Sequence, residues 1–204
     1  MKMRLTAICV SVAMLSSGAA FGLDMDPKFY VGAEAQYNKL KSANGPEFKG
    51  TDGKSMISKD KLPGGSLQAG VRLTENFGAE LGYAVFKNSV SNLVAGNGSV
   101  KAKLKTPYAD VLGYLPVASN INLIGSLGLG RLNTKMNITR NGVAVPLTQA
   151  QKDAAKAKVG ARVGLGAEYL FDANLGARAM VRYQKGNKAV KSVQSMSLGL
   201  FYQF

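Results

Sequence analysis

Apolar and polar residues alternate along many short segments of the chain. In the last twelve residues, large apolar side chains occupy every second position: Met196, Leu198, Leu200, Tyr202 and Phe204. Small or polar residues fill most of the gaps. A period of two predicts a β-strand with one apolar face, here one that ends in aromatic residues.

Seven further segments show the same alternation and predict seven more strands. They span residues 29–38, 65–73, 77–86, 103–115, 121–132, 157–170 and 175–184. Most are about the 9–11 residues that a tilted strand needs to cross a membrane. Within the fourth segment, Pro107 cannot donate to a ladder, so it is a candidate bulge that would shift the alternation. Asn141-Gly142 indicates a hairpin extension after the fifth segment.

The N-terminal segment predicts export. Lys2 and Arg4 precede an apolar run over 5–15 and small residues up to Gly22. These features are typical of a cleaved secretory signal peptide, so we expect residues 1–22 to be removed and 23–204 to form one domain. The single cysteine, Cys9, lies in that segment.

An exported chain of alternating strands without spanning helices predicts a closed barrel, because open sheet edges cannot be satisfied in lipid. The expected fold is all-β: an eight-stranded antiparallel up-and-down transmembrane β-barrel in the bacterial outer membrane. Long and short connections alternate along the chain. In such barrels the longer loops are extracellular and the short turns and both termini are periplasmic. The last strand should then close the barrel against 29–38.

Three segments carry a more specific resemblance, namely GLGRL, GLGAEYLF and the terminal LGLFYQF. With the eight strands, they resemble the small outer-membrane barrel family that includes opacity proteins, OmpX, the OmpA membrane domain and rickettsial-type surface adhesins. The resemblance implies an outer-membrane surface protein. The terminal Phe204 resembles the signal that the barrel-assembly machinery reads, which implies that machinery as a partner.

The alternation sorts the charged residues. Four carboxylates and four arginines fall on the inward face of the predicted strands: Glu34, Glu80, Asp110, Glu168, Arg72, Arg162, Arg178 and Arg182. Arginine suits buried pairing because its planar fork binds a carboxylate at two points. Across short turns we expect the pairs Arg72–Glu80 and Glu168–Arg178. Eight strands enclose an interior just wide enough for side chains, so this network should fill it.

Most of the remaining basic residues fall in the segments that this topology places at the extracellular end of the barrel. The formal net charge is +14, and in this topology every lysine except Lys2 and Lys28 falls in extracellular loops or strand tops. The candidate binding residues are Lys54, Lys59, Lys61, Lys101, Lys103, Arg140, Lys185 and Lys188. One interpretation is recognition of anionic groups outside the cell, on the envelope or the host: sulfated glycans, acidic proteins or a membrane surface. The other is that lysines near strand ends neutralise lipopolysaccharide phosphates: Lys87, Lys103, Lys158, Lys185 and Lys191.

Composition argues against chemistry. The chain has no histidine, so no base with a pKa near neutrality is available for a nucleophile. The chain has no His, and its one Cys lies in the segment that we expect to be removed, so only scattered carboxylates remain as metal ligands. We therefore expect no metal and no cofactor. The expected function is that of a structural surface protein or adhesin and not of an enzyme. A narrow porin-like channel is the alternative and an atypical enzyme is the least favoured, while an exported barrel should not bind nucleic acid.

Overall fold

A computed structural model describes residues 27–42, 61–91, 98–140, 143–145, 156–186 and 190–204. Within them lie nine strands: β1 (Lys28–Ser42), β2 (Lys61–Arg72), β3 (Phe77–Ser91), β4 (Gly98–Ala118), β5 (Ile121–Arg140), β6 (Val143–Val145), β7 (Lys158–Leu170), β8 (Leu175–Lys185) and β9 (Val190–Gln203). No helix in this part of the chain is long and apolar enough to cross a membrane.

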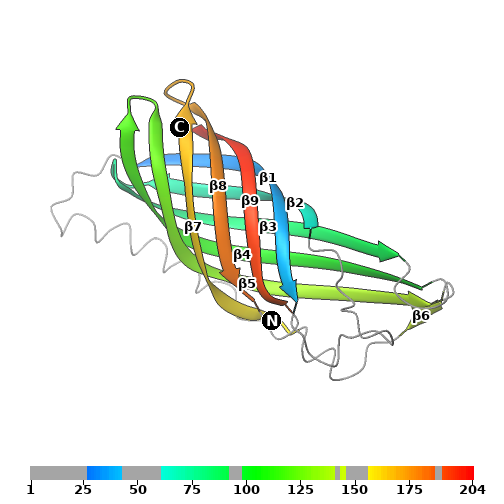
Figure 1. Ribbon diagram of the computed structural model, residues 1–204. Helices are drawn as coiled ribbons and strands as arrows, with labels where there is room; N and C mark the ends of the chain where they lie inside the picture. Colours follow the sequence, from blue (N-terminus) through cyan, green and yellow to red (C-terminus); the bar gives the residue numbers. More distant parts are fainter. Residues whose placement is uncertain (1–26, 43–60, 92–97, 141–142, 146–155, 187–189) are drawn as a thin grey trace, which may run out of the picture.

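Eight of these strands close into an antiparallel barrel, as predicted (Figure 1). The order around the ring is β1, β2, β3, β4, β5, β7, β8 and β9, and β9 pairs with β1 as expected. The ninth strand, β6, pairs only with the end of β5, with Arg140 opposite Val143 across the predicted hairpin.

The two ends of the barrel differ. At the turn end, short connections join β2 to β3, β4 to β5 and β7 to β8, and the two ends of the described chain meet. Phe29 N donates to Phe204 O at 3.2 Å, Phe204 N donates to Phe29 O at 2.8 Å, and the two rings stack with centroids 6.5 Å apart. We call the opposite end the loop end.

Three strands run past the barrel at the loop end and are longer than predicted. The pairs Ser91–Ser99 and Gly98–Arg140 extend β3, β4 and β5 into a protruding sheet that β6 joins (Figure 1). The prediction ended β3 at residue 86, began β4 at residue 103 and ended β5 at residue 132. The prediction was short because Ser, Asn, Lys and Thr dominate these extensions and carry no apolar alternation, whereas backbone pairing needs none.

Pro107 causes no bulge, contrary to the prediction. Pro107 lies opposite Tyr83 within an unbroken β3–β4 register. Against β5, the pairs Lys105–Asn133 and Tyr108–Gly130 keep one register on either side of the proline. Only individual pairs with β5 are missing, because a lost N–H removes one ladder bond without inserting a residue.

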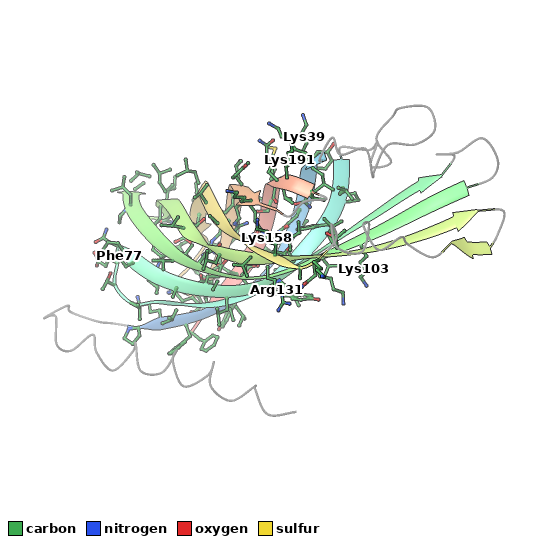
Figure 2. The ribbon with its side chains drawn as sticks, turned by 90° about the horizontal axis from the view of Figure 1, so that it is seen from below. Lys39, Phe77, Lys103, Arg131, Lys158 and Lys191 are labelled. Atoms are coloured by element: carbon green, nitrogen blue, oxygen red, sulfur yellow. The ribbon has the colours of Figure 1, made fainter. Side chains whose placement is uncertain are left out.

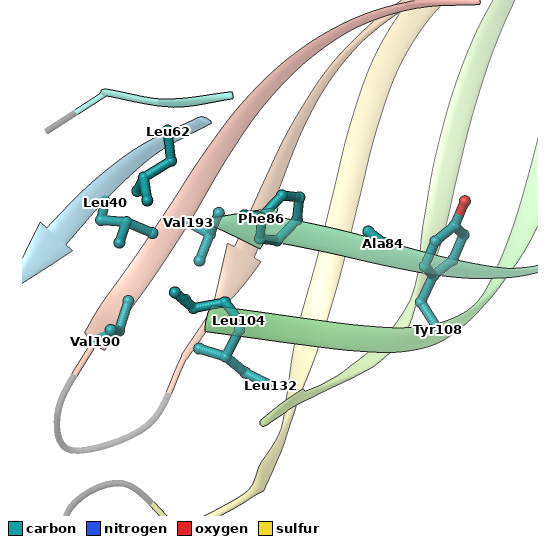
Figure 3. Close-up of a cluster of buried hydrophobic side chains, with 9 residues drawn as sticks. All are labelled: Leu40, Leu62, Ala84, Phe86, Leu104, Tyr108, Leu132, Val190 and Val193. Carbon is teal, nitrogen blue, oxygen red and sulfur yellow. The ribbon is translucent and has the colours of Figure 1, made fainter. Parts of the chain in front are cut away.

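Side chains fill the barrel in layers. At the turn end an aromatic layer contains Tyr30, Leu112, Tyr114, Ile124, Met180 and Phe201. Phe201 interrupts the alternation of the last strand and forms part of this layer, with its ring 6.1 Å from that of Tyr30. At the loop end lies a second apolar layer that the sequence analysis missed, made of Leu40, Leu62, Ala84, Phe86, Leu104, Tyr108, Leu132, Val190 and Val193 (Figure 3). Continuing the inward-facing alternation towards the loop end, from Asn38, Thr106 and Gly130, would have predicted part of this layer, namely Leu40, Leu104 and Leu132.

Candidate functional site

The interior also holds a network of ion pairs, and its most regular pair joins β1 to β8. Arg182 Nη1 lies 2.6 Å from Glu34 Oε2, and Arg182 Nη2 lies 3.0 Å from Glu34 Oε1. This two-point contact is the one that a guanidinium fork favours. Ser197 Oγ accepts a further hydrogen bond from Arg182 at 2.8 Å, and Gln68 donates to Glu34 at 3.2 Å.

Arg178 bridges two carboxylates. Its Nη1 lies 2.6 Å from Glu80 Oε2 and its Nη2 lies 3.3 Å from Glu168 Oε2, so the expected Glu168–Arg178 pair is present. The expected Arg72–Glu80 pair is wrong, because Arg72 pairs with Glu168. In the register Glu80 lies opposite Gly70, and Arg72 lies opposite Gly78.

The environment explains this exchange of partners. The Arg72 guanidinium lies over the Tyr114 ring, 3.9 Å from its centroid, and so reaches across the lumen and away from β3. Glu80 instead accepts a hydrogen bond from Tyr30 OH at 2.8 Å. Cross-strand neighbours are therefore not the only partners within a narrow barrel, because side chains from distant strands meet at its axis.

The fourth carboxylate completes the network. Arg162 Nε lies 2.8 Å from Asp110 Oδ2, and the Arg162 guanidinium lies 3.8 Å from the Tyr108 ring centroid. Each of the four predicted inward carboxylates thus pairs with an arginine, and all but Arg72 of the eight residues are buried. Asn122, which the sequence analysis did not single out, adds a bond to Glu168 at 3.0 Å. In the described residues, no cluster of three or more His, Cys, Asp or Glu is suited to a metal ion.

A second charged feature lies at the loop end. We call it the basic belt and define it by the cations at the level where the barrel ends and the extensions begin: Lys39, Lys41, Lys103, Lys105, Arg131, Lys158, Lys185 and Lys191. Lys105 is half-buried and the others are exposed. Figure 2 shows the labelled cations around this end and Phe77 at the other.

The belt has no balancing charge in the described part of the chain. The carboxylates there lie either in the lumen or, as Glu75 and Asp172, in the β2–β3 and β7–β8 turns at the opposite end. The unequal distribution gives the barrel a basic loop end, whose field attracts anions and weakens as salt screens it.

The predicted basic residues fall in three groups. Lys103 and Lys185 belong to the belt. Lys61, Lys101 and Arg140 lie in β2, β4 and β5 at the loop end, with only their backbone described, whereas Lys54, Lys59 and Lys188 lie outside the described residues. The candidate binding residues omitted Lys39, Lys41, Lys105 and Arg131, although the period of two that runs through Tyr37 would have carried the first two onto the outer face.

The outer wall between the two ends is apolar. Large side chains stand exposed around the ring, such as Leu67, Leu127, Leu165 and Leu198, with Leu165 73% exposed. A closed antiparallel barrel with an apolar outer wall, and with its charged side chains paired inside, has the architecture of an integral membrane barrel. The family model described as "Outer membrane protein beta-barrel domain" matches residues 5–204, and the chain belongs to this family.

Solved structures share this fold at low sequence identity. Neisserial surface protein A matches with a TM-score of 0.59 and 19% identity, over 86% of this chain and 97% of that one. OprG from Pseudomonas aeruginosa matches with a TM-score of 0.57 and 15% identity, over 88% and 97%. Ail from Yersinia pestis, in complex with the heparin analogue sucrose octasulfate, matches with a TM-score of 0.54 and 17% identity, over 89% and 100%. The resemblance to small outer-membrane barrels is confirmed, and no curated protein matches the sequence.

Proposed function

We propose that this barrel is a surface protein whose basic loop end faces the cell exterior and binds anionic groups of the envelope or of host glycans. The observation that carries the proposal is the unbalanced belt at one end of an otherwise charge-paired barrel. In outer-membrane barrels the longer loops are extracellular, which supports this orientation. The loop basic residues outside the described part of the chain would add to the same field.

The heparin analogue bound to Ail gives independent support, because a polysulfated sugar is the kind of anion that a cationic rim attracts. For the present chain we propose only the same chemical class of ligand, a densely charged anion. Recognition would depend on charge density more than on shape, so affinity should fall as ionic strength rises.

The proposal assigns no catalysis and no conduction to the barrel. Its interior holds two apolar clusters and four carboxylates that each pair with an arginine. Export by a cleaved segment 1–22 and insertion by an assembly machinery that reads the strand ending at Phe204 belong to the same proposal.

Binding of sucrose octasulfate to the folded protein at low and high salt tests the proposal. Six belt residues are neutralised to Gln together: Lys39, Lys41, Lys103, Lys105, Arg131 and Lys185. We expect the wild type to bind at low salt and to release the ligand at high salt, and the six-residue variant to bind at least about tenfold more weakly.

The matched control is Glu75→Gln with Asp172→Asn, which changes charge only at the turn end. It should leave affinity unchanged. Binding by the wild type that is insensitive to salt, or equal affinity of wild type and six-residue variant, would overturn the proposal.

A further inference from the structure

Part of the belt forms a compact cluster on the outer face of β1, β9 and β8, where the barrel closes. On β1, Lys39 lies opposite Gln194 of β9, and Lys41 lies opposite Ser192. On the other side of β9, Lys185 of β8 also lies opposite Ser192. Two lysines from different strands thus flank one uncharged residue, about two strand spacings apart.

A bulge brings a further cation to the same place. The β1–β9 register shifts between Lys41 and Ser42, which pairs with Val190, so Lys191 is left out of the ladder. Gly186 N donates to Lys191 O at 2.9 Å, which fixes the backbone there, and the Lys191 side chain is exposed. Bulges add an unpaired residue that re-aims a side chain, and here that residue is a lysine.

Below the cluster the same outer face becomes aromatic and then apolar. Tyr37 precedes Lys39 on β1, and Tyr183 precedes Lys185 on β8, each by two residues and so on the same face. Both rings are exposed, at 47% and 44%. Tyrosines at this level are typical of the membrane–water interface.

The apolar part continues along β9 towards the turn end. Met196, Leu198 and Leu200 face outward and are exposed, at 62%, 65% and 55%. Met196 lies opposite Tyr37. Cations, tyrosines and an aliphatic column therefore succeed one another along one line of the wall.

We propose that this cluster binds the headgroup of a phosphorylated glycolipid of the outer leaflet, with its acyl chains along Met196, Leu198 and Leu200. Lysine ammonium groups bind phosphate as point charges, and Gln194 and the tyrosines suit the sugar. A soluble glycan would use the cations but leave the aliphatic column without a role. The inference rests on the proposed orientation and names the partner for one part of the belt.

The other side of the ring supplies a matched comparison. Lys103 and Lys105 lie on β4, four strands away from β9 around the ring, and Arg131 lies on β5, three strands away. β4 and β5 continue past the barrel, whereas β1, β8 and β9 end within a few residues of the cluster. The second group therefore sits at the base of the protruding sheet, where it is suited to soluble anions.

The test uses the full folded protein in phosphatidylcholine nanodiscs containing lipopolysaccharide, intact or enzymatically dephosphorylated. The number of lipopolysaccharide molecules retained is measured by native mass spectrometry across a lipid titration. The cluster variant is Lys39→Gln with Lys41→Gln and Lys185→Gln. The matched control is Lys103→Gln with Lys105→Gln and Arg131→Gln, which removes the same charge.

We expect the cluster variant to lose at least about tenfold in affinity for intact lipopolysaccharide, and the control to lose less than about threefold. Dephosphorylation should lower the affinity of the wild type to that of the cluster variant. Equal losses in the two variants, or no effect of dephosphorylation, would overturn the inference.

Soluble sucrose octasulfate separates this inference from the proposed function. If that anion binds with salt dependence while lipopolysaccharide binding ignores the cluster, the inference fails alone. If neither ligand depends on the belt, both fail. If the cluster variant loses the soluble anion as strongly as the lipid, the cluster is a glycan site and the lipid assignment is wrong.

Discussion

Strand β8 carries cations into two different environments within eight residues. Arg178 and Arg182 point into the lumen, where each is about 2% exposed and each contacts carboxylates. Lys185 points outward at the loop end and is exposed. The residue types follow the environment, since a guanidinium pairs at two points in a dry interior and an ammonium stays hydrated at a surface.

The two sets of cations therefore differ in what they leave unsatisfied. In the lumen, removal of one member of an ion pair leaves the other as an unpaired buried charge, which is strongly destabilising. In the belt, the described chain supplies no carboxylate, and the positive charge remains available to a ligand. Lumen cations should thus govern stability, and belt cations should govern binding.

The largest expected effect is that of Arg178→Ala. This change leaves Glu80 and Glu168 without the arginine that bridges them. We expect a loss of about 3–5 kcal/mol in the free energy of unfolding, measured by urea titration of the folded form in detergent micelles. The same measurement on Lys185→Gln, on the same strand, should change by less than about 0.5 kcal/mol. Similar losses in the two variants would remove the distinction between lumen and belt.

A smaller effect is expected from glycines that face opposite sides of the wall. A Cβ at Gly82 would overlap the Tyr108 ring inside the barrel, whereas a Cβ at Gly113, on the outer wall, meets no atom within 4 Å. Gly82→Ala should destabilise by about 1–3 kcal/mol through overpacking. Gly113→Ala should be neutral or slightly stabilising in the same titration, because alanine in a strand has less backbone freedom to lose. A neutral Gly82→Ala would show that the interior is looser than its packing suggests.

The smallest effect concerns the turn end. Asp172 Oδ1 accepts hydrogen bonds from Asn174 N at 2.8 Å and Leu175 N at 2.7 Å. These backbone bonds, that from Leu175 first, lower the pKa of Asp172 below its ordinary value of 3.8. Because the folded pKa is the lower one, the stabilisation is present above pH 3.8 and is lost as pH falls through the folded value.

Asp172→Asn keeps an acceptor oxygen but cannot titrate, so its unfolding should lack this component of the pH dependence. Comparing urea midpoints of the two proteins between pH 5 and about pH 2 measures it. Identical pH profiles would mean that the turn contributes nothing to the acid sensitivity of the barrel.

Most of the barrel strands, and the faces on which their side chains lie, were predictable from the sequence. Most of the ion pairs inside the barrel were not. Alternation around Glu34, Glu168 and Arg178 placed these side chains inward, because a strand in a barrel has only an inside and an outside. The length of β3, β4 and β5 beyond residue 86, before 103 and after 132 was missed, since backbone pairing left no apolar pattern to read. The loop-end apolar layer was missed for the opposite reason, because Leu40 and Leu104 are apolar yet face inward.

The sequence by itself determined the side of the wall on which the eight lumen charges lie, because a period of two leaves only an inside and an outside. It also determined closure, because an exported sheet with open edges cannot be satisfied in lipid. Apart from the predicted Glu168–Arg178 pair, only the tertiary structure decided which charges meet. Arg182 and Glu34 pair although they are 148 residues apart in the sequence. Arg72 pairs with Glu168 and not, as the sequence had predicted, with Glu80. The cluster around Lys41 and Lys185 likewise exists only because closure of the barrel brings the first strand beside the last.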